Sequence, residues 1–206
     1  MRAEVRWGGS TSATPTRLEY GNRRLSVIGY RGLLMTSFTF DANDESATAA
    51  FGAALAEVLP AGTTVALCGT LGAGKTRLVQ AIAEALGIDR RNVVSPTFVL
   101  VQEHQGHRKI YHLDAYRLRD EDEFLALGPE EFFESDGLVL IEWADRVENC
   151  LPKDRIDIHI EVTGPQSRRF EVLPIGQRYA MIAAQLAQLI HHVSDSRKTQ
   201  NTVARR

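Results

Sequence analysis

At residues 69–76 the chain reads Gly69-Thr70-Leu71-Gly72-Ala73-Gly74-Lys75-Thr76, which matches the pattern G-x-x-x-x-G-K-[ST] at every fixed position. The preceding segment, 63–68, is β-branched and apolar and predicts a buried strand. The following segment has apolar residues at helical spacing from Leu78 to Leu86, and Gly87 ends this pattern. A strand, a glycine-rich loop and a helix in this order predict a phosphate-binding loop, or P-loop.

The residue types in this loop fit the binding of a nucleoside triphosphate. Glycine permits a sharp turn and exposes backbone N–H groups that can hold phosphate oxygens at a helix N-terminus. Lys75 can reach the β- and γ-phosphates, and the hydroxyl of Thr76 can bind Mg²⁺, which prefers oxygen ligands. The competing interpretation, a glycine-rich turn with an exposed lysine, does not account for the flanking strand and helix.

The composition limits the number of domains and the kind of partner. A chain of 206 residues with 44% hydrophobic content can bury one core and predicts one domain. The net charge is −2, but six arginines against two glutamates give residues 1–34 a charge of +4, and residues 192–206 carry +3. The segment between them therefore carries −9, which disfavours direct binding to a nucleic acid. We expect any contact with RNA to be made indirectly, through a partner.

The segments outside the central region do not have the composition of a folded domain. We expect residues 1–34 to be a disordered extension, residues 35–191 to form the P-loop domain and residues 192–206 to be a polar tail. The first segment is rich in Arg, Ser and Thr, as in an organelle transit peptide, and Met35 is an alternative start of the fold. Cys68 and Cys150 have neither disulfide nor zinc-ligand spacing, and no apolar run is long enough to span a membrane. These features predict a cytoplasmic protein.

The rest of the chain alternates between strand and helix patterns. This alternation predicts an α/β fold of the P-loop NTPase type, with a mostly parallel or mixed central sheet flanked by helices. The predicted strands cover residues 38–40, 63–68, 93–101, 109–114, 138–142, 155–162 and 168–173. The predicted helices cover residues 47–59, 75–86, 121–127, 129–133 and 179–190, and a hairpin is expected at 105–107.

Two predicted strands end on a carboxylate. Glu142 follows the apolar run 138–141, and Asp114 ends the strand 109–114. Ligands of open α/β sheets collect at the carboxyl ends of the strands, so both acids are candidates for the nucleotide site. We assign Glu142 to the magnesium ion and Asp114 to orienting the attacking nucleophile, although either could bind the metal directly.

Other residues have two interpretations each. Thr97 is either a switch hydroxyl that senses the γ-phosphate or an ordinary strand residue, and Arg117 and Arg168 either neutralise phosphate charge or are surface groups. Trp143 packs beside the site or fills the core. The histidines lack a convincing metal pattern and are interpreted as structural or surface residues: His104, His107 and His112.

The span from Phe38 to Leu173 resembles the TsaE (YjeE) family of bacterial P-loop ATPases. The resemblance depends on four motifs in one order: Gly69 to Thr76, Ser95-Pro96-Thr97-Phe98, His112-Leu113-Asp114-Ala115-Tyr116-Arg117-Leu118 and Leu140-Ile141-Glu142-Trp143. The chain departs from the family at Thr70, Arg77 and His104, where an acid, a threonine and a tyrosine are common.

The resemblance implies an ATPase that acts with the TsaD and TsaB proteins in making threonylcarbamoyladenosine in tRNA, with ATP and Mg²⁺ as cofactors. It implies catalytic roles for Asp114, Lys75 and Thr97, and a metal site at Thr76 and Glu142. The implied nucleotide contacts are Gly69, Leu71, Gly72, Ala73, Gly74, Lys75, Thr76, Arg77, Glu45, Thr48 and Arg168.

Two other functions remain open on the same fold. A small-molecule P-loop kinase is the main alternative, although no Arg-rich lid is evident. A nucleotide-gated binding module without hydrolysis is the third. A GTPase is disfavoured because no Asn-Lys-x-Asp segment is present.

Overall fold

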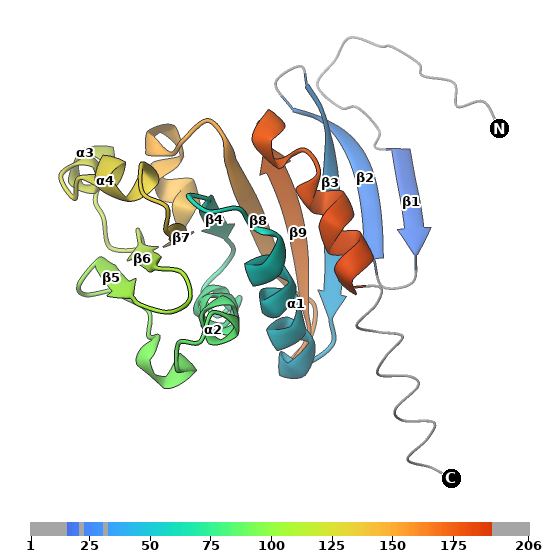
Figure 1. Ribbon diagram of the computed structural model, residues 1–206, viewed down its shortest axis with the longest axis horizontal. Coiled ribbons are helices and arrows are strands. Elements are labelled where there is room, and N and C mark those ends of the chain that lie inside the picture. The colour runs from blue at the N-terminus through green and yellow to red at the C-terminus, as the bar shows by residue number, and fades with distance from the viewer. Residues whose placement is uncertain (1–15, 21–22, 31–32, 191–206) are drawn as a thin grey trace.

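The P-loop joins a buried strand to a helix at the centre of the molecule. In the computed structural model, which describes residues 16–20, 23–30 and 33–190, β4 (Thr64–Cys68) leads into the loop and α2 (Lys75–Ala85) follows it (Figure 1). Gly74 precedes α2 with a φ of 105°, a left-handed conformation that a residue with a Cβ rarely adopts. The apolar face of α2 is buried, so tertiary packing fixes the position of the loop.

The described strands form one nine-stranded sheet in the order β1-β2-β3-β9-β8-β4-β7-β6-β5. The centre is parallel, because β4 pairs with β7 and β8, and β7 pairs with β6. The remaining pairs are antiparallel. The bounds are β1 Thr16–Tyr20, β2 Arg23–Tyr30, β3 Leu33–Ala42, β5 Val101–His104, β6 Ile110–Asp114, β7 Leu138–Glu142, β8 Arg155–Val162 and β9 Arg168–Ile175. The predicted α/β fold is confirmed.

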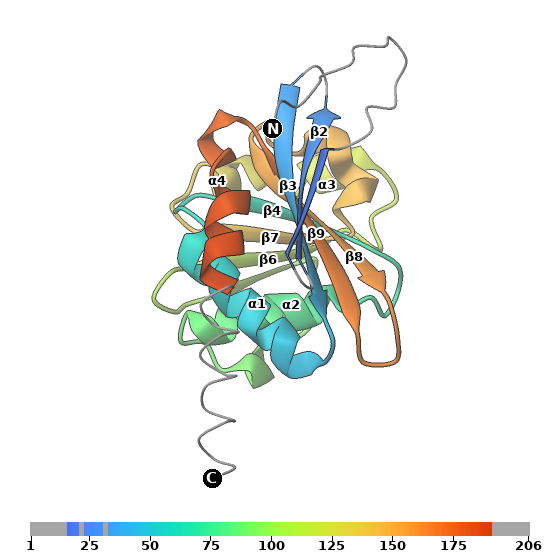
Figure 2. The same cartoon turned by 90° about the vertical axis from the view of Figure 1, so that its right-hand side faces the viewer.

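Helical elements cover both faces of the sheet. Side chains along β4 point alternately to the two faces of the sheet, so the hydrophobic core has two parts. Val65 and Leu67 belong to the part that contains α1 (Glu45–Val58), α2 and a helix at residues 182–190, whereas Ala66 belongs to the part on the other face. Figure 2 shows α1 beside the 182–190 helix on one side of the sheet. The short elements are α3 Glu121–Leu125, α4 Pro129–Phe133 and the 3-10 helices η1 Arg90–Asn92, η2 Ala144–Cys150 and η3 Gln177–Tyr179. The second core lies beneath α3 and η2.

Helices α1 and α2 are packed closely at Gly52. A Cβ on Gly52 would lie 2.4 Å from the Cβ of Ala81, so only glycine fits between the two helices. The N-terminus of α1 is capped by Asp44, whose carboxylate accepts a hydrogen bond from the Ala47 N–H at 2.7 Å. The start of α1 is thereby fixed beside the P-loop.

Three predictions of secondary structure need correction. Residues 93–100 are irregular, and the strand begins only at Val101, because Leu100 has a φ of 67° and the Pro96 carbonyl accepts hydrogen bonds from the Val99 and Leu100 N–H groups. The last helix begins at residue 182, after η3. Residues 16–20, 23–30 and 33–34, predicted to belong to a disordered extension, lie in β1, β2 and β3, whereas residues 1–15 and the tail from 191 lie outside the described residues.

Candidate active site

The carboxyl ends of three parallel strands bring the predicted acids next to the P-loop. In the register of the sheet, Glu142 pairs with Leu67 on one side and with Asp114 on the other. Both carboxylates are only 3% exposed. The strand runs before them are buried throughout, which explains why the polar groups emerge only where the strands end.

Lys75 lies within the curve of the P-loop. Its ammonium group donates hydrogen bonds to the carbonyl oxygens of Gly69 at 2.7 Å and Thr70 at 3.1 Å. Burial lowers the pKa of Lys75, and the neighbouring carboxylates Glu142, Asp145 and Asp114 oppose this effect. The geometry thus holds a cation among three acids at the start of α2.

Trp143 packs beside the site, which decides between its two interpretations. The Lys75 Nζ lies 3.5 Å from the centroid of the Trp143 ring, and the Tyr116 ring lies 4.8 Å from it. Trp143 has a φ of 58°, which is uncommon for a bulky residue. The local backbone is therefore strained directly after Glu142, at the position that places an aromatic face under the lysine.

Thr76 and Glu142 offer oxygen ligands to a cation. The Thr76 hydroxyl donates to the Glu142 Oε2 at 3.0 Å, and the Glu142 Oε1 lies 2.8 Å from the His112 Nε2. In the described part of the chain, no group of three His, Cys, Asp or Glu residues could hold a metal ion. The residues present fit Mg²⁺, which binds one or two protein oxygens and completes its coordination with water and phosphate oxygens.

Asp114 is held by two hydroxyl groups from the irregular segment 93–100. Its Oδ2 accepts hydrogen bonds from the Ser95 Oγ at 2.6 Å and the Thr97 Oγ1 at 2.8 Å, and its Oδ1 accepts one from the Tyr116 N–H at 2.8 Å. Thr97 therefore contacts the predicted catalytic acid and is not a strand residue. From the sequence, Ser95 was named only within a motif and His112 was interpreted as a structural or surface residue, although each lies two residues from a predicted site residue.

A cavity of about 590 Å³ adjoins the P-loop. Its lining brings together several predicted nucleotide contacts from α1, the loop, α2 and β9: Glu45, Thr48, Gly72, Gly74, Arg77 and Arg168. Arg77 forms an ion pair with Glu45 at 3.6 Å, which connects α2 to α1. Leu71 is 77% exposed at the tip of the loop, whereas Ala73 is fully buried.

Arg168 supports the loop from β9. Its guanidinium donates hydrogen bonds to the carbonyls of Ala73 at 2.8 Å and Gly72 at 3.3 Å, and also to those of Gly164 and Ser167. These contacts tie the outer turn of the loop to the β8–β9 hairpin. Arg117 is different, because its guanidinium stacks at 4.2 Å on the ring of Phe98, which is 82% exposed.

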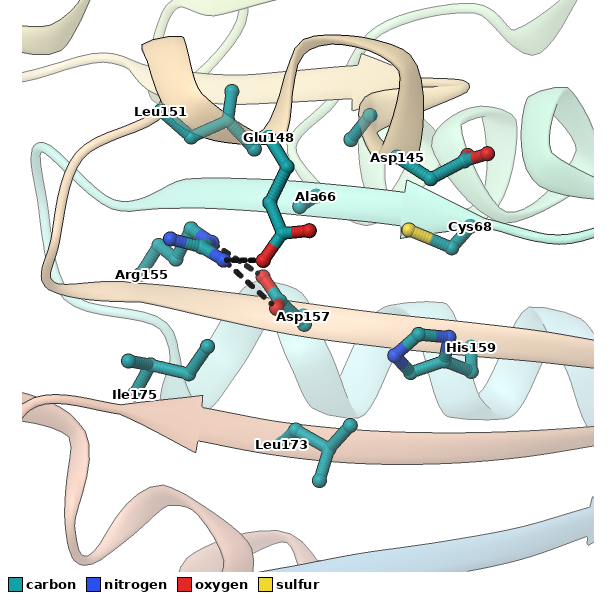
Figure 3. A pocket seen from close by; sticks show the side chains of 11 residues that line it. Ala66, Cys68, Asp145, Glu148, Leu151, Arg155, Asp157, His159, Leu173 and Ile175 are labelled. Atoms are coloured by element: carbon teal, nitrogen blue, oxygen red, sulfur yellow. Dashed lines mark hydrogen bonds and ion pairs between the residues drawn. The ribbon is translucent and has the colours of Figure 1, made fainter. Parts of the chain in front are cut away.

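A second cavity, of about 210 Å³, lies on the sheet face that η2 covers (Figure 3). Arg155 is paired there with Asp157 at 2.7 Å and with Glu148 at 3.7 Å, so its charge is balanced. Burial and two nearby carboxylates raise the pKa of the Cys68 thiol to about 12, which keeps the thiol protonated and unreactive. This cavity shows no arrangement of catalytic groups.

Comparisons with known proteins identify the family of this chain. Residues 42–170 match the family model for threonylcarbamoyl adenosine biosynthesis protein TsaE. The tRNA threonylcarbamoyladenosine biosynthesis protein TsaE of Bacillus subtilis (strain 168) is 41% identical over 128 residues, which are 62% of this chain and 79% of the relative. The protein of the same name from Streptomyces coelicolor is 37% identical over 139 residues, which are 63% of this chain and 91% of the relative.

Among solved structures, the crystal structure of YdiB from Bacillus subtilis superimposes with a TM-score of 0.64 at 32% sequence identity. The match covers 74% of this chain and 95% of that chain. No helix in the described ranges combines the length and the apolar character needed to cross a membrane. The family model covers more than half of the chain and all four of its site motifs, so the chain belongs to the TsaE family of threonylcarbamoyladenosine biosynthesis proteins.

Proposed function

We propose that this chain is a magnesium-dependent ATPase that acts on a complex of TsaD and TsaB during the synthesis of threonylcarbamoyladenosine in tRNA. One observation carries the proposal: the P-loop residues Lys75 and Thr76 meet the carboxylates Asp114 and Glu142 where three parallel strands end. Phosphoryl transfer requires mainly positioning and charge stabilisation, and these four residues supply both.

Lys75 and the loop backbone bind the phosphates in this proposal. The ammonium group now donates to two loop carbonyls, and phosphate oxygens are stronger acceptors that would replace them. The aromatic face of Trp143 limits the directions in which the lysine can move. The nucleoside occupies the cavity of about 590 Å³ between α1, the loop and β9, where Glu45, Thr48 and Arg77 line the wall.

Thr76 and Glu142 hold the magnesium ion, which when bound neutralises phosphate charge. Asp114 orients a water molecule towards the γ-phosphate. Its carboxylate accepts three hydrogen bonds, from Ser95, Thr97 and the Tyr116 N–H, so its orientation is fixed before ATP arrives. Thr97 connects this carboxylate to the segment 93–100 and is the residue that we assign to sensing the γ-phosphate.

The partners are proposed from the family assignment and from charge. The central region carries a charge of −9, which is unsuited to holding the tRNA backbone alone. We therefore assign contact with tRNA to the TsaD–TsaB complex. We place the activity in the cytoplasm, where the thiols of Cys68 and Cys150 remain reduced.

ATP hydrolysis tests the proposal. The rate of phosphate release is measured for the purified chain alone and with TsaD, TsaB and tRNA, using the native chain and Lys75→Ala. We expect slow hydrolysis alone, stimulation by the partners, and loss of both activities in Lys75→Ala. A native chain that binds ATP without hydrolysing it under either condition would support the gated binding module instead.

A small-molecule kinase is the competing activity on this fold. It predicts transfer of the γ-phosphate to a metabolite and no stimulation by TsaD and TsaB. Phosphorylated product in the same assays would favour the kinase over the ATPase.

A further inference from the structure

His112 is fully buried and contacts a carboxylate of the site. Its Nε2 lies 2.8 Å from the Glu142 Oε1, and the side chains of both residues are at most 4% exposed. A carboxylate has no proton to donate, so the hydrogen bond requires a hydrogen on the Nε2 of His112. The imidazole is therefore the donor and Glu142 is the acceptor.

This hydrogen bond continues into the P-loop helix. The second oxygen of Glu142, Oε2, accepts from the Thr76 hydroxyl at 3.0 Å. The two hydrogen bonds thus connect His112 of β6, Glu142 of β7 and Thr76 of α2 through one carboxylate. With each oxygen engaged by a different element, the carboxylate plane has little freedom to rotate.

The other nitrogen of His112 has no comparable role. Three buried side-chain atoms on β5 and β6 lack a hydrogen-bond partner in the described part of the chain: Gln102 Oε1, His104 Nε2 and His112 Nδ1. Gln102 lies opposite His112 in the strand register, and the His104 ring lies 6.2 Å from the His112 ring. A buried polar atom without a partner is destabilising, so an apolar side chain would suit the core better at position 112.

We propose that His112 is a positioning residue that orients the Glu142 carboxylate for magnesium, acting through the hydrogen bond from its Nε2. This inference rests on the proposed function, because it assigns Glu142 to the metal. Partners that orient a metal ligand typically change metal affinity by 10- to 100-fold when they are removed.

The test compares two substitutions of His112 whose side-chain amide can each replace one of the two imidazole nitrogens. In His112→Gln the amide nitrogen can take the position of Nε2, whereas in His112→Asn it can take only that of Nδ1. Binding of ATP is measured by calorimetry at increasing Mg²⁺ concentration and again in excess chelator, and the thermal midpoint shows that each variant is folded. His104→Asn is the matched control, since it changes the neighbouring buried ring.

We expect His112→Asn to raise the Mg²⁺ concentration for half-maximal ATP binding by about tenfold, with affinity in chelator unchanged. His112→Gln should restore most of the native value, and His104→Asn should match the native chain. Equal Mg²⁺ dependence in all folded variants would overturn the role of His112 alone. A native chain whose ATP binding does not depend on Mg²⁺ would overturn the proposed function, and the inference with it.

Discussion

Arg168 supports the backbone of the P-loop, where we propose that the nucleotide binds. Its guanidinium donates to the carbonyls of Gly72 and Ala73, so Arg168→Ala leaves the outer turn of the loop without these donors. Losing a charged hydrogen bond of this kind costs about 1.5 kcal/mol, which corresponds to about tenfold weaker ATP binding. Calorimetric titration of ATP measures the change.

Arg169→Ala is the matched control for this prediction. Arg169 is the next residue, but it pairs with Asp41 at 2.8 Å and Glu161 at 3.3 Å, away from the loop carbonyls. We expect native ATP affinity in Arg169→Ala. Equal weakening by both substitutions would show that the effect comes from the strand and not from support of the loop.

Lys75 makes stability depend on pH in a defined direction. Burial lowers the pKa of its ammonium group in the folded state below its ordinary value of 10.5, so the unfolded chain binds more protons between the two pKa values. The native chain therefore gains stability as pH rises through this window towards 10.5. Lys75→Met lacks this gain, and urea unfolding of both proteins across the pH range measures the difference in their free energies of unfolding.

Lys109→Met gives the contrasting result for a lysine with a raised pKa. Glu103 raises the pKa of Lys109 through an ion pair at 2.6 Å, so this lysine adds no stability with rising pH below 10.5. We expect the difference in free energy of unfolding between Lys109→Met and the native chain to stay constant below pH 10.5. A constant difference for Lys75→Met as well would contradict the burial of its charge.

At the scale of elements, the site depends on close packing of α1 against α2. Gly52→Ala would place a Cβ 2.4 Å from the Cβ of Ala81 and force the helices apart. Overpacking of this kind destabilises by about 1–3 kcal/mol, although the higher helix propensity of alanine offsets about 1 kcal/mol. Urea unfolding should therefore show a net loss of stability for Gly52→Ala.

At the exposed neighbouring position of the same helix, Ala53, we expect alanine to be more stabilising than glycine, the opposite of position 52. Ala53→Gly should destabilise by about 1 kcal/mol through helix propensity alone. Alanine would then be favoured at position 53 and glycine at position 52. Stabilisation by Gly52→Ala would contradict the contact between the helices.

The segment 93–100 shows why some elements were not predictable from the sequence. Its β-branched residues favour a strand locally, but Ser95 and Thr97 instead donate hydrogen bonds to Asp114 of β6. This partner is almost twenty residues away, so periodicity contains no information about it. The strands β4, β6 and β7 were predicted correctly because each is a short, mainly apolar run that is buried apart from the half-buried Cys68.

At the scale of the whole molecule, the order of the sheet separates the N-terminal strands from the site. β1 and β2 lie beyond β3, β9 and β8 when counted from β4. A chain that begins at Met35 should therefore bind ATP with a dissociation constant within about twofold of the native value, since distant parts of a structure contribute independently. Loss of ATP binding in a truncated chain that is still folded would contradict this separation.

The arrangement of the candidate site was more predictable from the sequence than the edges of the sheet. The P-loop and the two acids follow local patterns, and the structure brings them together as parallel strand ends require. The N-terminal strands were missed because their Arg- and Ser-rich composition resembles a disordered extension, although apolar residues alternate on each side of Gly21-Asn22. The roles of Arg168, Ser95 and His112 depend on contacts between elements and could not be derived from spacing.

We propose that the P-loop and Asp114 form one hydrolytic site. The most direct test measures phosphate release from ATP by Asp114→Asn together with TsaD, TsaB and tRNA, with ATP binding measured in parallel. We expect hydrolysis to fall by about 100-fold while binding is retained, because the amide keeps the shape of the side chain but loses the carboxylate that orients water. Hydrolysis at the native rate in Asp114→Asn would contradict it.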